Sequence, residues 1–209
     1  MPALVYGFGS QKRSGKIPST ASLDESPFMK LEIVKIGNPL LRKKTRALSR
    51  SQLKLKKLQT FLKGMTRAMR HAQGVGLAAN QIGLSMRAFV MECRGNRRYP
   101  RVDSFPLQAY LNPKIVRYSK AKEGGWEGCL SIPGFRGKVS RSKQVTLAAI
   151  TSDGRRIQKT FRGFEARVVQ HEVDHLNGFF YMDRMDSLKT WTHLEEFNQR
   201  FKYEVKDKK

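Results

Sequence analysis

The sequence is poor in several residue types and patterns, and each shortage excludes a class of protein. Its 209 residues include only two cysteines, Cys93 and Cys129, which are too few for a disulfide framework. No apolar run approaches the roughly 18 residues that a membrane-spanning helix needs. Residues 1–6 lack the charged and long apolar regions of a secretory signal. We therefore expect a soluble protein in a reducing compartment, with the cytoplasm as the predicted location.

Acidic residues are also scarce. Asp and Glu number 17 against 41 Lys and Arg, so the net charge is +24. A positive field of this size attracts nucleic acid, ribosomes or anionic membranes. A generally basic proteome or a long solvated surface would give the same excess. No recognition motif for nucleic acid is present, so sequence-specific binding of nucleic acid is not expected.

One folded domain is expected at residues 29–209, preceded by a flexible basic tail at residues 1–28. The tail is rich in Ser, Gly, Lys and Pro and lacks periodicity. It is either a simple extension or an organellar transit peptide, and the second would place the protein in a mitochondrion or plastid. Hydrophobic residues make up 39% of the chain, which is enough for a sizeable core.

The order of patterns predicts an α+β fold, with antiparallel strands around a central helix and with flanking helices. Apolar alternation and short apolar runs predict strands at residues 31–36, 86–93, 109–118, 143–150, 155–161 and 179–182. One flanking helix is capped by Ser49 or Ser51 and ends near Gln73, and the other covers residues 187–205. Residues 95–108 are expected to form an exposed loop.

The central helix is predicted at residues 164–177, where apolar residues recur at helical spacing and Asn177-Gly178 follows as a stop. It carries His171-Glu172-x-x-His175. Two histidines four positions apart lie on one face of a helix and can hold one metal ion. The glutamate between them can take a proton from water beside that metal. Two histidines that share a helix by chance would give the same pattern.

A catalytic metal site of this type needs a third protein ligand and an open position. Glu195 or Glu196, about 20 residues after His175, would indicate a zinc peptidase. The other candidate is Cys129, in the glycine-rich segment 123–134, where the backbone can approach a ligand closely. A thiolate is the stronger ligand for a soft or borderline cation, although a single cysteine is more often only a small buried residue.

Three motifs together resemble those of peptide deformylases, which remove the N-formyl group from nascent proteins. Residues 74–81 (GVGLAANQ) are similar to the family's glycine-alanine-glutamine motif, residues 127–131 (EGCLS) to its cysteine motif, and residues 170–175 (QHEVDH) to its histidine motif. They occur in the family's order, and the resemblance extends from about residue 31 to about residue 186. H-E-x-x-H alone is shared with many peptidases, whereas the three motifs together are specific.

The resemblance implies a metal-dependent hydrolase that releases formate from the N-terminal formyl-methionine of newly synthesised polypeptides. The implied metal ligands are Cys129, His171 and His175, and Glu172 would act as general base and then as general acid. The family commonly uses Fe(II), so iron is expected, although a Cys-His-His site can also hold Zn, Ni or Co.

The resemblance also implies how the substrate is held. The Gln81 side-chain amide and the Leu130 backbone N–H would stabilise the oxyanion. By itself, Gln81 would be interpreted as a loop residue bonded to backbone. Gly74 and Gly76 would let a peptide pair as an added strand, or would only end the preceding helix. The implied substrate-binding positions are Gly74, Val75, Gly76, Gly128, Arg136, Arg167 and Val168.

Two further expectations depend on the same resemblance. Glu127 and Asp174 are candidates to orient a metal ligand, although the sequence names no partner for either. The positive charge would favour transient electrostatic contact with the ribosome, where the substrate emerges, through the lysine-rich helix, the tail and the C-terminal end.

Overall fold

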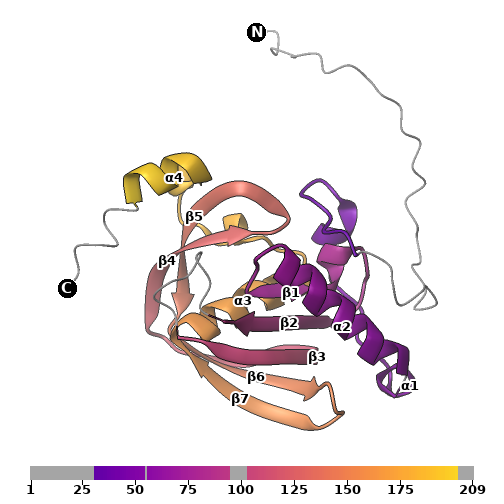
Figure 1. Ribbon diagram of the computed structural model, residues 1–209. Coiled ribbons are helices and arrows are strands. Elements are labelled where there is room, and N and C mark those ends of the chain that lie inside the picture. Colours follow the sequence, from indigo (N-terminus) through magenta and orange to yellow (C-terminus); the bar gives the residue numbers. More distant parts are fainter. Residues whose placement is uncertain (1–30, 55, 95–102, 202–209) are drawn as a thin grey trace, which may run out of the picture.

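The computed structural model describes residues 31–54, 56–94 and 103–201, and it shows an α+β fold with two antiparallel sheets (Figure 1). The larger sheet has the strand order β1-β2-β3-β6-β7. These strands are Gly76–Ala78, Ala88–Cys93, Phe105–Tyr118, Gln144–Thr151 and Arg156–Arg162. The smaller sheet has the order β4-β5-β8, with β4 at Lys122–Cys129, β5 at Ile132–Ser142 and β8 at Thr192–His193. The predicted fold class is therefore confirmed.

Two helices cover opposite faces of the larger sheet. They are α2 (Lys56–His71) and α3 (Gly163–Leu176). Side chains alternate along a strand, so Phe89 and Met91 of β2 pack with the α3 residues, whereas Ala88 and Val90 pack with the α2 residues. The apolar stripe of α2 is buried there, at Leu58, Leu62, Met65 and Met69.

The β4–β5 hairpin packs on the other side of α3, so this helix lies between the two sheets (Figure 1). A third core cluster joins the hairpin to neighbouring turns, with Leu41, Cys129, Ile132, Val139, Phe180 and Tyr181 as its buried members. The central position predicted for the H-E-x-x-H helix follows from this arrangement. One face of α3 completes the main core, and the opposite face meets the hairpin.

The C-terminal end of α3 is fixed by side chains from distant segments. Thr45 donates from its backbone N–H and its hydroxyl to the Leu176 carbonyl, at 2.9 and 3.0 Å. Arg87 Nη1 reaches the same carbonyl at 3.3 Å. Asn80 Nδ2 donates to the His175 carbonyl at 2.6 Å. Carbonyls in the last turn of a helix lack partners within the helix, and here three other segments supply them.

Several predicted elements match the structure closely. Ser49 caps α1 (Arg50–Leu53) in a capping box with Gln52, and α2 follows within the range predicted for the first flanking helix. The β6–β7 hairpin turns at residues 152–154, where Gly154 has a φ of 88°. Cys93 is buried in β2, as expected for a structural thiol.

Other predicted elements are wrong. Residues 31–36 form no strand, because Val34 N–H donates to the Gln81 carbonyl and Ile36 N–H to the Ser131 carbonyl, at 2.8 and 2.9 Å. The segment thus bridges two loops instead of joining a ladder. The strand predicted at residues 179–182 is replaced by the 3₁₀ turn Tyr181–Arg184, in which the Asp183 carboxylate accepts the Phe180 N–H.

The C-terminal region also differs from its prediction. Instead of one helix from residue 187, it contains the 3₁₀ turn Leu188–Thr190, strand β8 and the shorter helix α4 (Leu194–Phe201). β3 begins at Phe105, inside the range predicted as a loop. The tail at residues 1–28, most of the predicted loop (95–102) and residues 202–209 lie outside the described residues. Among the described helices, none is long and apolar enough to cross a membrane.

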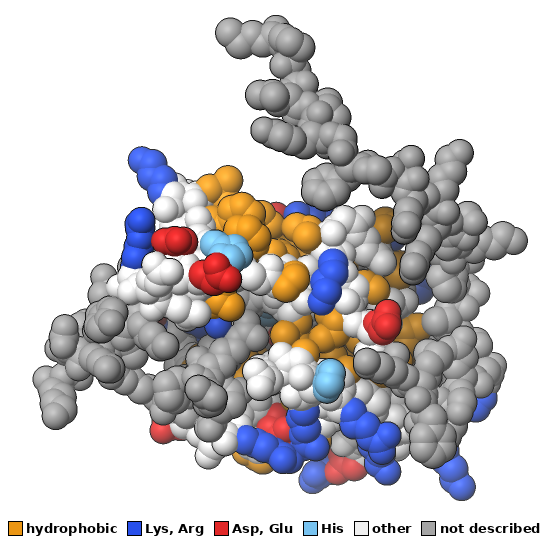
Figure 2. All heavy atoms as spheres, turned by 45° about the horizontal axis from the view of Figure 1, so that its top comes forward, with side chains coloured by type: hydrophobic (Ala, Val, Ile, Leu, Met, Phe, Trp, Pro, Cys, Tyr) orange, Lys and Arg blue, Asp and Glu red, His pale blue; other side chains and the backbone are white. Residues whose placement is uncertain are grey.

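One face of the molecule is hollowed, and hydrophobic side chains gather in its middle while Lys and Arg side chains stand along its margins (Figure 2). A cleft opens between β1 on one side and β4 on the other, with α3 as its floor. The three sequence motifs meet at this cleft, because each supplies residues to its lining.

Candidate metal centre

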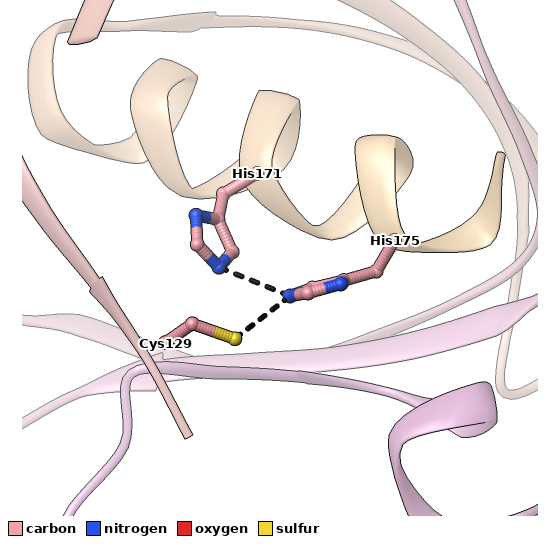
Figure 3. A group of neighbouring side chains, drawn as sticks. All are labelled: Cys129, His171 and His175. Atoms are coloured by element: carbon pink, nitrogen blue, oxygen red, sulfur yellow. Dashed lines mark hydrogen bonds between the residues drawn. The ribbon is translucent and has the colours of Figure 1, made fainter. Parts of the chain in front are cut away.

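Three side chains from two elements converge next to the cleft, whose lining includes one of them, His171 (Figure 3). His171 and His175 project from one face of α3, and Cys129 ends β4 opposite them. The Nε2 atom of His175 lies 3.2 Å from the Cys129 sulfur and 3.2 Å from His171 Nε2. All three ligand atoms lie within 4.8 Å of one another. The structure therefore brings together the three residues predicted as metal ligands.

The surroundings of the histidines fit a divalent transition metal. Glu127 Oε2 lies 3.0 Å from His171 Nδ1, so that nitrogen carries the proton and Nε2 turns its lone pair toward the centre. Burial lowers the pKa of His175 and keeps its ring neutral. One thiolate and two neutral imidazoles form a donor set that suits Fe(II), Zn, Ni or Co.

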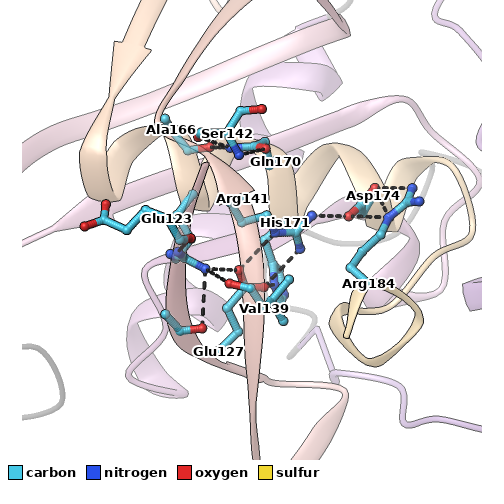
Figure 4. A network of polar contacts seen from close by, with 12 residues as sticks. Glu123, Glu127, Val139, Arg141, Ser142, Ala166, Gln170, His171, Asp174 and Arg184 are labelled. Atoms are coloured by element: carbon cyan, nitrogen blue, oxygen red, sulfur yellow. Dashed lines mark hydrogen bonds and ion pairs between the residues drawn. The ribbon is translucent and has the colours of Figure 1, made fainter. Parts of the chain in front are cut away.

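Glu127 stands at the centre of a buried polar network (Figure 4). Arg141 binds its carboxylate through Nε and Nη2, both at 3.0 Å, and Arg167 Nη1 donates to it at 2.8 Å. Burial alone would raise the pKa of Glu127. The hydrogen bond with His171 and the charge of Arg141 outweigh burial and hold that pKa well below its usual range. The sequence predicts that Glu127 orients a metal ligand, and the ligand that Glu127 contacts is His171.

Asp174 is linked to the metal centre indirectly, through Arg141 and Glu127. It pairs with Arg141 Nη1 and with Arg184, whose Nη2 lies 2.8 Å from Oδ1. Asp174 thus contacts none of the three candidate ligands directly. It binds Arg141, and Arg141 in turn binds Glu127 (Figure 4). This arrangement makes Arg141 the link between the two carboxylates.

Replacing Arg141 by Met should lower the free energy of unfolding by about 3–5 kcal/mol, because two buried carboxylates would lose their shared partner. Urea denaturation at equal metal content would measure the loss. Arg155→Met is the matched control, since the Arg155 side chain is 78% exposed and its ion pair among the described residues is with the half-exposed Asp153. Equal stability of the two variants would contradict a structural role for the network.

Glu172, the predicted general base, points into the cleft from α3. Its Oε2 is buried and has no hydrogen-bond partner among the described side chains and backbone groups. Burial raises its pKa to about 7, where a carboxyl group can both accept and donate a proton near neutral pH. A Cβ atom added at Gly76 would lie 2.3 Å from Glu172 Oε1. Because Gly76 has no side chain, the Glu172 carboxylate can occupy this space.

The contact gives a testable expectation for Gly76→Ala. The added methyl group should displace the Glu172 carboxylate and lower kcat by about 100-fold, the cost typical of a misplacement near 1 Å. Metal content should not change, because Gly76 contacts no ligand. Steady-state kinetics and metal analysis would test both parts. Gly124→Ala serves as the control, since its Cβ would meet only the flexible Lys138 side chain, at 3.2 Å.

Gln81 lies beside the metal centre in the 3₁₀ turn Ala79–Ile82. Its Oε1 accepts the Ala78 N–H at 2.9 Å, which fixes the orientation of the amide. Its Nε2 consequently faces the Ser131 hydroxyl at 3.1 Å and the Cys129 sulfur at 3.5 Å. Gln81 is thus bonded to backbone, as a loop glutamine would be, and it also presents its donor to the site.

The cleft contains most of the predicted substrate-binding residues. Its lining includes Gly74, Val75, Gly76, Gly128, Leu130, Arg167 and Val168. Arg136 is not part of this lining; its guanidinium covers Gly128, where an added Cβ would lie 3.0 Å from Nη1. Trp126 and Phe164 also line the cleft, and the sequence prediction missed both. Trp126 could have been found, because it stands two residues before Gly128 in the cysteine motif's strand.

The carboxylates proposed for a zinc peptidase lie away from the centre. Glu195 and Glu196 belong to the first turn of α4, and their side chains are 83% and 53% exposed. Glu195 approaches His193 at 3.8 Å, and Glu196 approaches Arg200 at 4.0 Å. The metal-ligand group found among the described residues contains Cys129 instead.

Comparisons with known proteins agree with this geometry. The family model for polypeptide deformylase matches residues 30–191. A peptide deformylase of Leptospira biflexa is 39% identical over 168 residues, which cover 80% of this chain and 94% of the relative. Peptide deformylase 1 of Prochlorococcus marinus is 40% identical over 155 residues, which cover 74% of this chain and 80% of the relative.

Solved structures resemble the fold as well. The class I type b peptide deformylase from Acinetobacter baumannii with Met-Ala-Ser bound has a TM-score of 0.73 and 36% identity, over 75% of this chain and 99% of that one. Peptide deformylase from Thermotoga maritima has a TM-score of 0.67 and 33% identity, over 76% of this chain and 99% of that one.

Proposed function

Because the chain belongs to the polypeptide deformylase family, we propose that Cys129, His171 and His175 hold the metal with which it removes the N-formyl group from new polypeptides. This assignment rests on the convergence of these three ligand atoms next to a cleft that is lined by His171, Glu172 and Gln81. The protein is a metal-dependent peptide deformylase.

The reaction adds water across the formyl–nitrogen bond and yields formate and a free α-amine. A divalent cation at this site would act as a Lewis acid and lower the pKa of a water molecule beside it. Glu172 takes the proton of the attacking water and later donates it to the departing amine. Its position on the cleft floor, between the two histidines, and its pKa of about 7 suit both steps.

The oxyanion that forms on the formyl group needs donors that are already oriented. Gln81 Nε2 is one such donor, because the Ala78 N–H holds the other end of its amide. Leu130 follows Cys129, and its side chain lines the cleft while its carbonyl accepts from Lys35 Nζ at 3.0 Å. The Leu130 backbone N–H is proposed as the second donor.

Gln81→Glu should lower kcat by about 10²–10³-fold, the usual cost of losing one oxyanion donor. The substitution keeps an oxygen for the Ala78 N–H and replaces only the donating NH₂ group. Bound metal should change little, whereas the melting temperature should fall, because the new carboxyl group is buried beside the Cys129 sulfur. Formate release and metal analysis would test this, and an unchanged kcat would remove Gln81 from the mechanism.

The reaction itself is tested by formate release from formyl-Met peptides. The purified protein, reconstituted in turn with Fe(II), Zn, Ni and Co, should release formate with at least one metal. Absence of release with all four would overturn the assignment. We propose Fe(II) as the native metal, since the mixed sulfur and nitrogen ligands suit it. Metal analysis after anaerobic purification would show iron as the main metal, and a zinc-loaded protein would contradict this choice.

We also propose that α2 makes the electrostatic contact with the ribosome. This helix contains no acidic residue, and its solvent side presents Lys56, Lys57, Lys63 and Arg67 as exposed side chains. The spacing of Lys56, Lys63 and Arg67 places them along one line of the helix. Such a line can follow a phosphate backbone without reading base sequence.

Cosedimentation with ribosomes at increasing salt tests the role of α2. Affinity should fall steeply with salt, and a Lys63→Ala/Arg67→Ala double variant should flatten the log–log slope by roughly two. Lys122→Ala/Lys138→Ala removes the same charge from β4 and β5 and should leave the slope nearer to that of the parent. Equal slopes for both double variants would argue against a specific role of α2.

A further inference from the structure

The C-terminal segment returns to the hairpin that carries Cys129. β8 pairs with β5, with His193 opposite Phe135 and Thr192 opposite Arg136. The Trp191 ring stacks on Phe135, with centroids 4.3 Å apart and an interplanar angle of 14°. Trp191 Nε1 donates to the Tyr181 hydroxyl at 3.1 Å. These contacts fix the start of α4 against the hairpin.

α4 then contacts the wall of the cleft through Phe197. Its ring lies 4.9 Å from the Trp126 ring, edge to face at 68°, and the Arg136 guanidinium carbon lies 5.8 Å from its centroid. Trp126 in turn lines the cleft together with Phe164 and Arg167. Edge-to-face pairs of this kind hold a ring in a preferred orientation. Phe197 is not part of the cleft lining and supports the wall through its contact with Trp126.

The position of Trp126 can be related to an extended substrate. A peptide that pairs with Gly74–Gly76 as an added strand places alternate side chains on the same side. We place its first side chain in the cavity beside Phe164 and Val168, which both line the cleft. Its third side chain then lies on the same side, roughly 7 Å further along the strand. Trp126 belongs to the wall of that same cavity and can lie under it.

We propose that Trp126, positioned by Phe197 of α4, forms a platform for the side chain of the third residue of the substrate. This inference rests on the proposed function. A flat aromatic surface favours apolar and aromatic side chains, because it removes their surface from water without a polar partner. Formyl-Met peptides with Leu or Phe in the third position should therefore be preferred over those with Gly. Phe197 acts through Trp126 and is a positioning residue.

Formyl-Met-Ala-X peptides test this platform, with X as Gly, Leu or Phe. The parent should show a kcat/KM about five- to tenfold higher for Phe than for Gly, mainly through KM. Trp126→Ala should abolish the difference between the Phe and Gly peptides. Phe197→Ala, which removes only the ring that supports Trp126, should lower the Phe value to the Gly value and leave the Gly value within about twofold. Phe197→Leu keeps apolar volume behind the ring and should restore part of the preference. Phe179→Ala, which removes an exposed ring that contacts Arg184, should change neither value.

Fluorescence gives a second readout that does not depend on turnover. The chain has two tryptophans, so Trp191→Phe leaves Trp126 as the reporter. The product Met-Ala-Phe should change its emission more than Met-Ala-Gly does. Formate release from all peptides without any dependence on X would overturn the platform and leave the proposed function intact. An equal loss for every X in Phe197→Ala would also overturn it, whereas no release from any peptide would overturn both.

Discussion

Glu172→Gln is expected to lower kcat for formate release on the order of 10³-fold while leaving bound metal unchanged. Glutamine has the same shape as glutamate but cannot take a proton from water. The side chain is fully buried beside His171, so no solvent-exposed base can replace it. Formate assays and metal analysis of the same preparation would separate loss of the base from loss of the ligands.

The same variant should be at least as stable as the parent. Glu172 Oε2 is buried without a partner among the described residues, so the parent holds an uncompensated carboxyl group that an amide would relieve. Glu195→Gln is the matched control, since it makes the same change on an 83% exposed side chain. A Glu172→Gln variant that unfolds at a much lower temperature would indicate a structural role for the carboxylate instead.

Cys129→Ala is expected to lower metal affinity by more than about 100-fold and to abolish formate release. Removal of a partner that only orients a ligand already costs about 10–100-fold, and removal of the ligand itself should cost more. Alanine fits the site, because Cys129 is buried beside Ile132 in the third core cluster. Metal titration of the apoprotein would give the affinity, and circular dichroism would check the fold.

A double Glu195→Ala/Glu196→Ala variant tests the alternative in which one of these carboxylates is the third metal ligand. Both carboxylates lie on α4 and are exposed, so the double variant should keep its metal and its kcat. Retention of metal by Cys129→Ala, together with its loss from the double variant, would favour the zinc-peptidase alternative. That result would also remove the three-ligand centre from the mechanism.

The sequence predicts α3 well because all the information lies within one helix. Apolar spacing, the following Asn177-Gly178 and the two ligand histidines are local properties, and the structure places the helix within one residue at each end. The third ligand is different. Cys129 Sγ meets His175 only through the packing of β4 against α3, and no local pattern contains that contact. The family resemblance supplied it.

Strands β4 and β5 could not be predicted from local preference. Their glycines disfavour strands by themselves. In the folded chain, side chains from distant segments occupy the space beside these glycines: a Cβ at Gly125 would lie 2.8 Å from Arg167, and one at Gly137 would lie 2.5 Å from Met185. The glycines are therefore explained by tertiary contacts that a linear pattern does not contain.

At residues 31–36 the sequence predicts a strand that the structure does not contain. Their alternation satisfies the strand pattern, but Val34 and Ile36 donate to carbonyls on two separate loops. Trp126 and Phe164 escaped the site prediction for a related reason, since each lies on a regular element and only the cleft between β1, β4 and α3 makes them neighbours.

The fixed end of α3 has a consequence for hydrogen exchange. Helix ends normally fray, and amides in a last turn exchange with solvent through small local openings. Here Thr45, Arg87 and Asn80 bind the carbonyls of His175 and Leu176 from three distant parts of the chain. Opening this turn requires all three segments to separate, so its amides should exchange at rates near those of global unfolding. The second histidine thus keeps its place for as long as the whole domain stays folded.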